Sequence, residues 1–284
     1  MKPAGNSVLR CKPLLGTFVK VLVVGERAEE ELLATSARVF KEIQRTEELM
    51  SFHDARSELF RINERAHRES VEISPQTAKA IAFALDLCAK TQGRFELTVG
   101  RDSRPASTIA ASKTTPAAPA NWRDVDLEGT TIRFKRPLRI NLGSIVKGYA
   151  VDRGFTCLDD GIEAIVDAGG ALRMSHWRDE SVVIRVPNAM GQKPARVQVP
   201  MQNCAVSTMA NANIHSRRPV FSRVKRQPIG DHRTVSVFAP NSMLAEALTQ
   251  TALLDPESGS LFASYGAKCL IVDPETAALN GEPN

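Results

Sequence analysis

The segment INLGSIVKGYAVD, from Ile140 to Asp152, decides how this chain is interpreted. An apolar strand runs into Gly143, and a helix is expected from about Val146 to Asp159. A strand, a glycine turn and a helix with Lys147 near its start bring backbone N–H groups and an ammonium to one place, which favours an anion site. The same layout is also common as a purely structural turn. The segment alone leaves both interpretations open.

Two later segments also combine apolar and polar residues in a specific pattern. In VDAGG (Val166–Gly170), a strand ends in paired glycines, which allow a ligand to approach closely but equally fit a tight turn. In MLAEALTQTALL (Met243–Leu254), Glu246, Thr249 and Gln250 are three and four positions apart, so they share a helix face. These side chains predict either a hard-cation site with oxygen ligands or a solvated polar stripe.

The N-terminal part of the chain predicts a strand followed by two helices. The β-branched segment Thr17–Val24 predicts a strand that ends at Gly25. A helix is expected between Glu29 and Phe52, and its apolar residues at helical spacing are Leu33, Ala37, Phe40, Ile43 and Met50. In the second helix Ser74 is the cap, Pro75 takes the first position and Gly93 closes the segment, with Ala78, Ile81, Leu85 and Cys88 on one face.

The rest of the chain predicts short strands with helices between them. Strands are expected at Thr131–Phe134, Leu138–Leu142, Ala164–Asp167, Val182–Val186, Arg196–Val199, Thr234–Ala239 and Lys268–Val272, with a late helix over Ser242–Leu254. This irregular alternation predicts an α+β or mixed α/β fold. We expect one domain over residues 1–284, with Ser103–Ala120 as a mobile surface loop because the segment is rich in Pro, Ser and Ala.

Composition excludes several classes of protein. The formal charge of +5 favours anionic ligands in general, but aromatic residues are only 5% and do not alternate with the basic ones, as binding of nucleic acid by base stacking would require. No apolar run reaches the roughly 20 residues of a membrane span, and the start lacks the apolar core of a secretory signal. Five scattered cysteines without a CxxC pair indicate reduced, structural thiols. We therefore expect a cytoplasmic protein.

Seven segments, in this order, resemble the ApbE-like FAD:protein FMN transferases. They are LLGTFVKV (Leu14–Val21), MSFHDARSELFRIN (Met50–Asn63), GRFELTVG (Gly93–Gly100), NLGSIVKGYAVD (Asn141–Asp152), VDAGG (Val166–Gly170), TVSVFAP (Thr234–Pro240) and MLAEALTQTALL (Met243–Leu254). No single segment is unique to the family. The resemblance rests on their common register over nearly the whole chain.

The resemblance implies an α+β protein with mixed sheets and flanking helices that binds FAD in a cleft between two lobes. It also implies Mg²⁺ on the FAD diphosphate and transfer of FMN to a threonine or serine of an acceptor protein, with AMP as the leaving group. The positions that match the family's FAD-binding segments are Glu96, Leu97, Thr98, Asn141, Ser144, Lys147, Gly169 and Gly170. The positions that match its metal site are the carbonyl near Val146 and the side chains of Glu246, Thr249 and Gln250.

The chain departs from the family pattern at several acidic positions. Glu96, Asn141 and Glu246 stand where the family has Asp, and Glu246 is one methylene longer in a site where Mg²⁺ requires tight octahedral geometry. The family's HIIDPRTG-type segment, which carries a histidine assigned as base, is replaced within Ile214–Arg233 by HSRRPVFSRVKRQPIGDHR. His215 is the first candidate to replace that base and His232 the second.

The sequence leaves three functions in competition. The first is an FMN transferase that modifies a partner protein, and the second is a flavin-binding relative with lost or weak transfer. The third is a basic nucleic-acid-binding protein, which the sparse aromatic residues disfavour. We favour the transferase because Glu246 keeps a carboxylate and Thr249 keeps a hydroxyl on the helix face that the family uses.

Overall fold

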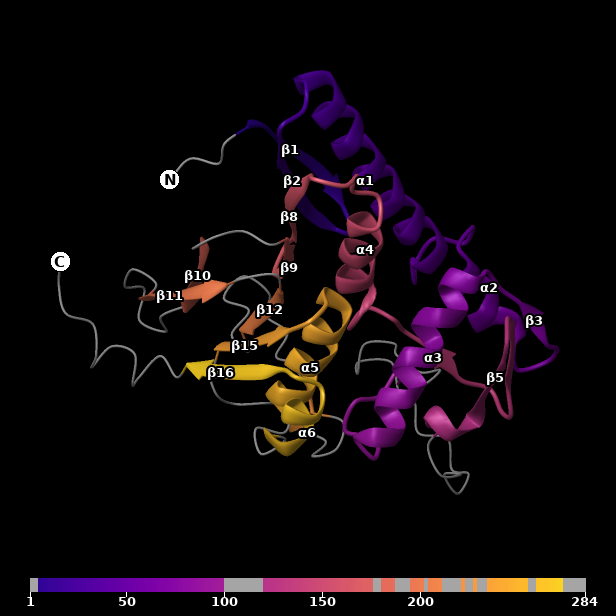
Figure 1. Ribbon diagram of the computed structural model, residues 1–284. Helices are drawn as coiled ribbons and strands as arrows, with labels where there is room; N and C mark the ends of the chain where they lie inside the picture. Colours follow the sequence, from indigo (N-terminus) through magenta and orange to yellow (C-terminus); the bar gives the residue numbers. More distant parts are fainter. Residues whose placement is uncertain are drawn as a thin grey trace. The chain divides into compact units, whose positions relative to one another are not determined.

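The computed structural model describes residues 5–99, 120–175, 180–186, 195–201, 204–210, 221–222, 227–228, 234–254 and 259–272. The chain forms two compact units, the first from Met1–Arg45 with Lys147–Asn284 and the second from Thr46–Val146. It passes from the first unit to the second within helix α1 (Glu29–Met50) and returns at the start of helix α4 (Val146–Phe155), as Figure 1 shows.

The first unit is built on a seven-stranded sheet in which all neighbouring strands are antiparallel. In spatial order its strands are β1 (Asn6–Leu14), β2 (Thr17–Gly25), β8 (Glu163–Ala168), β9 (Ala171–Met174), β12 (Ala205–Ala210), β15 (Thr234–Ala239) and β16 (Lys268–Val272). Two further antiparallel pairs are β10 (Glu180–Val186) with β11 (Ala195–Met201) and β13 (Phe221–Ser222) with β14 (Gln227–Pro228). The predicted strands in this unit are confirmed, whereas β1, β9, β12, β13 and β14 were not predicted.

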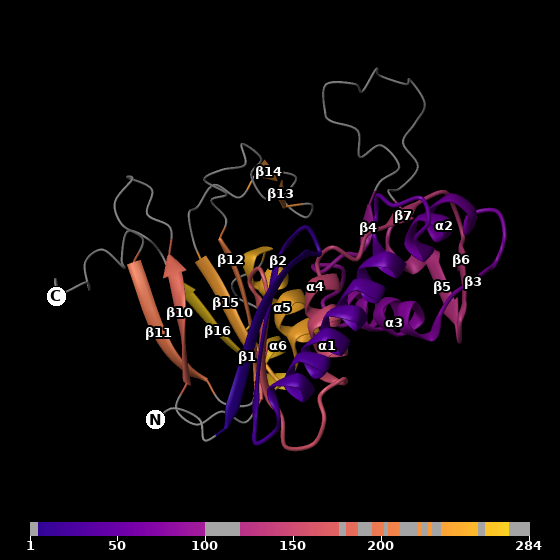
Figure 2. The same cartoon turned by 90° about the horizontal axis from the view of Figure 1, so that it is seen from above.

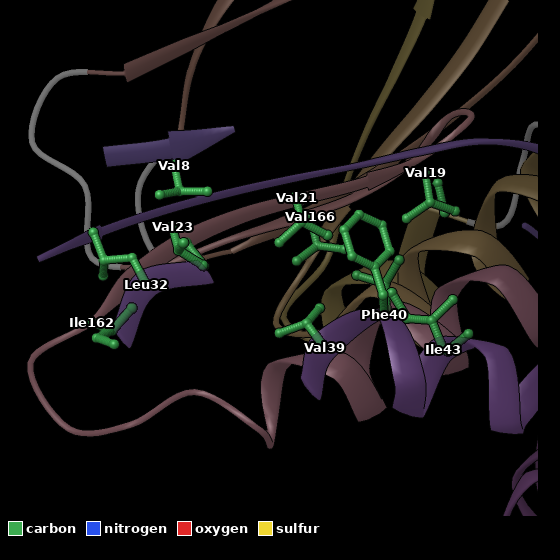
Figure 3. Packing of buried hydrophobic residues seen from close by; sticks show 14 residues of the cluster. Val8, Val19, Val21, Val23, Leu32, Val39, Phe40, Ile43, Ile162 and Val166 are labelled. Atoms are coloured by element: carbon green, nitrogen blue, oxygen red, sulfur yellow. The ribbon is translucent and has the colours of Figure 1, made fainter. Parts of the chain in front are cut away.

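Helices α1 and α4 cover one face of this sheet. Their buried side chains interlock with the inward residues of β1, β2 and β8, as Figure 3 shows for Phe40 and Ile43 against Val19 and Val166. The predicted apolar face of α1 is partly wrong, because Leu33 and Ala37 are exposed and the core takes Leu32 and Val39 instead. The buried face of α1 also includes the hydroxyl residues Thr35 and Ser36. The spacing of apolar residues alone therefore predicted the wrong buried face.

Helices α5 (Ser242–Leu254) and α6 (Gly259–Ser264) connect β15 to β16 and pack on strands at the other end of the sheet. α5 packs on β9, β12 and β15, and Figure 2 shows α5 and α6 on one side of these strands with the β10–β11 pair on the other. A second apolar cluster, formed by Val24, Met174, Met201 and Val206, includes a residue of β11. α5 has the bounds that the sequence predicted, whereas α4 ends at Phe155 rather than at Asp159.

The second unit combines small sheets with helices α2 (Glu58–Arg65) and α3 (Pro75–Lys90). One sheet orders its strands β3 (Val71–Glu72), β6 (Thr131–Phe134) and β5 (Val125–Glu128), and a 3₁₀ turn, η2 (Trp122–Asp124), leads into β5. The other sheet pairs β4 (Thr98–Val99) with β7 (Arg139–Ile140), which is shorter than the predicted strand Leu138–Leu142. Helix α2 was not predicted from the sequence.

The start of α3 confirms the predicted cap. The Ser74 side chain accepts a hydrogen bond from the Thr77 N–H at 3.3 Å, and Pro75 takes the first position. Glu58 of α2 accepts hydrogen bonds from the Ser74 N–H and from the hydroxyls of Ser74 and Thr77, so it ties α2 to α3. Gly93 ends the segment with φ of 81° and donates to the Cys88 carbonyl at 2.8 Å.

All five cysteines are free, as their scattered positions predicted. Cys88 is fully buried in α3, and burial raises the pKa of its thiol to about 12. This thiol therefore stays protonated at neutral pH and acts as a small apolar core residue. Within the described part of the chain, none of the helices combines the length and the apolar character that crossing a membrane requires.

Candidate functional site

The first unit brings helices α4 and α5 into direct backbone contact. A Cβ atom on Gly148 of α4 would lie 2.5 Å from the carbonyl carbon of Ser242 and 2.7 Å from the Cα of Met243, both in α5. Only glycine allows this approach. We call the contact region formed by Lys147, Gly148 and Asp152 of α4 with Ser242, Met243 and Glu246 of α5 the α4–α5 junction.

Glu246 is buried at the α4–α5 junction with both carboxylate oxygens engaged. Its side chain is 2% exposed; the Lys147 ammonium donates to Oε1, and the Gly148 N–H donates to Oε2 at 2.8 Å. A buried carboxylate is tolerated only when it is paired and hydrogen-bonded, and these two donors meet that requirement. The predicted anion-binding lysine is therefore directed to a carboxylate of the protein itself.

Asp152 holds the first turn of α5. Its carboxylate accepts from the Ser242 N–H at 2.9 Å and from the Met243 N–H at 2.8 Å, and Arg173 of β9 donates to it at 2.7 Å. Burial raises the pKa of Asp152, although the two N–H donors and Arg173 act in the opposite direction. No role was predicted for Asp152, although it is the last residue of the segment Ile140–Asp152.

The polar residues of α5 are not a solvated stripe. Glu246 and Thr249 are buried, and the Thr249 hydroxyl lies 2.6 Å from the Ala245 carbonyl and 3.1 Å from the Ser207 carbonyl of β12. Gln250 is half-buried, and its Oε1 is inaccessible to solvent and finds no hydrogen-bond donor among the residues that the structure describes. A buried acceptor without a donor needs an explanation, and an additional cationic ligand is one.

The paired glycines form a tight turn between β8 and β9. β8 ends at Ala168 and β9 begins at Ala171, so the loop between these paired strands has two residues, Gly169 and Gly170. Their φ angles are 63° and 105°, and a type I′ hairpin turn requires positive φ at both positions. A Cβ on Gly169 would lie 2.9 Å from Cγ2 of Thr17. The turn by itself accounts for both glycines, so a Gly169→Val variant would disturb the sheet and is no selective test of ligand binding.

The second unit brings together two segments that were predicted to bind FAD. β4 and β7 pair Thr98 with Ile140, and the Asn141 N–H donates to the Leu97 carbonyl at 2.8 Å. Glu96 accepts from the Thr98 N–H at 2.9 Å, so its carboxylate folds back on its own segment. Asn141 accepts from the Gly143 N–H at 2.8 Å and shapes the turn that carries half-buried Ser144.

Asn63 of α2 holds this strand and turn in place. Its side chain donates to the Ile140 carbonyl at 2.9 Å and accepts from the Ile140 N–H at 2.8 Å, and it is only 6% exposed. The Asn63 side chain thereby satisfies the backbone N–H and carbonyl of Ile140, as a neighbouring strand would. Sequence reasoning missed this role; an amide at the end of an otherwise amphipathic eight-residue segment was the available signal.

We expect the Asn63→Ala variant to destabilise the second unit by about 2 kcal/mol, because the buried N–H and carbonyl of Ile140 would lose their partners. Urea unfolding followed by circular dichroism measures the effect. Asn6→Ala, which removes one hydrogen bond at an exposed position, is the control and should change stability by less than about 0.5 kcal/mol. Equal effects of the two substitutions would show that the hydrogen bonds between Asn63 and Ile140 do not stabilise the second unit.

Other predicted residues fall outside the described part of the chain. His215 and His232 lie there, as does the predicted loop Ser103–Ala120 up to residue 119. Among the residues that the structure describes, no cluster of three or more His, Cys, Asp or Glu side chains could hold a metal ion. A cation at the α4–α5 junction would thus depend on one carboxylate and on neutral oxygens, all of them hard donors of the type that Mg²⁺ accepts.

Comparison with known proteins shows which family the chain resembles. The model of the ApbE family matches residues 15–271. A FAD:protein FMN transferase of Haemophilus influenzae is 24% identical over 251 residues, covering 77% of this chain and 72% of that protein. One of Vibrio cholerae is 25% identical over 199 residues, covering 65% of this chain and 59% of its own length, which is less than two thirds.

Solved structures show the same fold. The ApbE protein of Thermotoga maritima superposes with a TM-score of 0.76 at 22% identity, covering 98% of this chain and 100% of that one. The flavin transferase ApbE of Vibrio cholerae gives a TM-score of 0.74 at 20% identity, covering 95% and 94%. The predicted fold, mixed helix and sheet of the ApbE type, and the predicted enzyme class, a transferase, are confirmed. With the family model matching nearly its whole length, the chain belongs to the ApbE family.

Proposed function

We propose that this protein is a FAD:protein FMN transferase that binds FAD and attaches FMN to a threonine or serine of an acceptor protein. The observation that carries the proposal is the family match over residues 15–271, which includes both helices of the α4–α5 junction. The relatives named FAD:protein FMN transferase support the proposed activity. The predicted cytoplasmic location and the absence of nucleic acid among the partners stay predictions from the sequence.

The proposed reaction breaks one phosphorus–oxygen bond and forms another. The hydroxyl oxygen of the acceptor bonds to the phosphorus of the FMN half of FAD, and the bond from that phosphorus to the AMP half breaks. AMP leaves, FMN stays on the acceptor as a phosphoester, and the hydroxyl proton passes to a base. We propose His215 for that base.

The proposed FAD contacts come from both units. In the second unit they are Glu96, Leu97, Thr98, Asn141 and Ser144, which the β4–β7 pair and the following turn hold together. In the first unit they are Lys147, Gly169 and Gly170. Each set of residues is positioned by hydrogen bonds within its own unit.

We further propose that Mg²⁺ binds to Glu246, Thr249, Gln250 and the carbonyl of Val146. Two observations fit a cation there: the carboxylate of Glu246 is buried, and Oε1 of Gln250 has no hydrogen-bond donor within the described part of the chain. When bound, the ion would supply positive charge to the diphosphate. Lys147 already pairs with Glu246, so the ion and the ammonium compete for one carboxylate.

We expect the purified protein to bind FAD at least about tenfold more tightly than FMN, because the adenine half adds contacts that FMN cannot make. Titration followed by quenching of flavin fluorescence gives both dissociation constants. Glu96→Gln, which keeps the shape of the side chain that folds back on the Thr98 N–H, is a mild variant for the adenine side and should narrow the difference. Equal constants for FAD and FMN in the parent protein would contradict the proposed binding mode.

The alternative function is a flavin-binding relative with lost or weak transfer. The observation that favours it is the pairing of Glu246 with Lys147, which occupies the carboxylate proposed for the metal. The two functions differ in one product. A transferase releases AMP from FAD when Mg²⁺ and an acceptor are present, whereas a flavin-binding protein does not.

A further inference from the structure

Lys147 is the resident counter-ion of Glu246. The carboxylate is 2% exposed, and its two oxygens are held by the Lys147 ammonium and by the Gly148 N–H. The Lys147 side chain is 28% exposed, so it is in contact with solvent, whereas the Glu246 side chain is almost fully enclosed. Removing the ammonium without a replacement would leave a buried, half-paired negative charge, which is strongly unfavourable.

No second carboxylate of the α4–α5 junction is available to receive a cation. Asp152, the other acidic residue there, already accepts from two N–H groups of α5 and from Arg173. The described residues contain no acidic or histidine cluster that could hold a metal. A divalent cation added beside the intact Lys147–Glu246 pair would therefore leave two uncompensated positive charges in a mostly buried site.

A diphosphate ligand would change this balance. It carries negative charge, and its oxygens accept hydrogen bonds from a lysine ammonium, which binds phosphate as a point charge. Lys147 lies in the first turn of α4, where the helix dipole favours an anion. A ligand there would draw the ammonium away from Glu246 and free the carboxylate for a cation, while its own charge compensates the surplus.

We propose that Lys147 and a divalent cation exchange on Glu246, and that the cation gains access to this carboxylate only when a diphosphate ligand takes the ammonium. The proposal rests on the proposed function, because FAD is the diphosphate in question. It makes metal binding and FAD binding positively coupled. By linkage, the factor by which FAD tightens the cation equals the factor by which the cation tightens FAD.

The test measures binding of Mn²⁺, as the probe for Mg²⁺, from the loss of its free electron paramagnetic resonance signal. In FAD-free protein we expect the parent to bind Mn²⁺ weakly and Lys147→Met to bind it at least about tenfold more tightly. Lys147→Arg, which keeps the charge, should behave like the parent. The double variant Lys147→Met with Glu246→Gln should lose the gain, since the freed carboxylate causes it. Equal Mn²⁺ affinity in the parent and in Lys147→Met would overturn the proposal, as would a gain that survives Glu246→Gln.

A second measurement uses only the parent protein, so that it holds even if Lys147→Met fails to fold. FAD should tighten Mn²⁺ at least about tenfold, and Mn²⁺ should tighten FAD by the same factor, after correction for Mn²⁺ bound to free FAD. Independent binding of the two would overturn the exchange. Failure of the proposed function looks different: FAD would not bind at any Mn²⁺ concentration, while the variants in FAD-free protein would still decide whether Lys147 competes with the cation.

Discussion

Replacing Gly148 by alanine is expected to lower the free energy of unfolding by about 3 kcal/mol, although the substitution adds only one methyl group. The added Cβ would lie 2.5 Å from the carbonyl carbon of Ser242 and 2.7 Å from the Cα of Met243. Both are backbone atoms, so no side-chain rotation relieves the contact. The helices α4 and α5 would have to separate, which also breaks the hydrogen bond from the Gly148 N–H to Glu246.

Gly154→Ala in the same helix is the matched control. Its Cβ would meet Val39 Cγ1 at 3.0 Å and Ile43 Cδ1 at 3.3 Å, which are side-chain atoms that can adjust. Alanine also favours a helix over glycine by about 1 kcal/mol, so the control should be near neutral. Chemical unfolding of both variants, with FAD titration of the folded fraction, measures the difference. If Gly148→Ala is as stable as Gly154→Ala, the backbone contact between α4 and α5 does not exist as described.

Asp152→Ala is expected to destabilise the protein by about 3 kcal/mol, because it leaves the Arg173 guanidinium and the Ser242 and Met243 N–H groups without their shared acceptor. Asp152→Asn keeps one acceptor oxygen and should lose less, about 1–2 kcal/mol. Unfolding in urea at neutral pH gives both values. Since α5 carries Glu246, the loss of the acceptor that holds its first turn should also weaken FAD binding in the folded protein.

The control for Asp152 is Asp86→Ala. Asp86 pairs with Lys90 across one turn of α3 with both side chains about half exposed, and such pairs contribute little. We expect a change below about 0.5 kcal/mol. An Asp152→Ala variant no less stable than Asp86→Ala would show that Asp152 does not hold the first turn of α5.

The sequence predicted elements well where local signals agree. Ser74 and Pro75 mark the start of α3 because a cap and a proline act within one turn, and α5 is apolar enough to be found with its bounds. β1 was not predicted because it is an edge strand of the described sheet and leaves Leu9 68% exposed, so it lacks the alternation of a half-buried strand. In α1 the buried face includes Thr35 and Ser36, which an apolar pattern passes over.

The site could be predicted only in its parts. Of the α4–α5 junction, Lys147 and Glu246 were identified from their segments, but their pairing joins positions 99 residues apart, which no single-sequence pattern encodes. Asp152 and Asn63 were overlooked for the same reason, because each acts on the backbone of an element distant in the sequence. The need for glycine at position 148 becomes evident only from the structure, in which the backbone of Ser242 leaves no room for a Cβ atom.

Mass spectrometry of an acceptor protein after incubation with this protein, FAD and Mg²⁺ is the most direct test of FMN transfer. The acceptors are taken from a fractionated extract of the source cells and followed as flavin fluorescence that survives denaturing electrophoresis. We predict one acceptor peptide that gains FMN on a threonine or serine, together with one AMP released for each FMN attached, and no gain with Glu246→Ala. An acceptor mass that stays unchanged while FAD binds and no AMP appears would contradict a transferase and leave a flavin-binding protein.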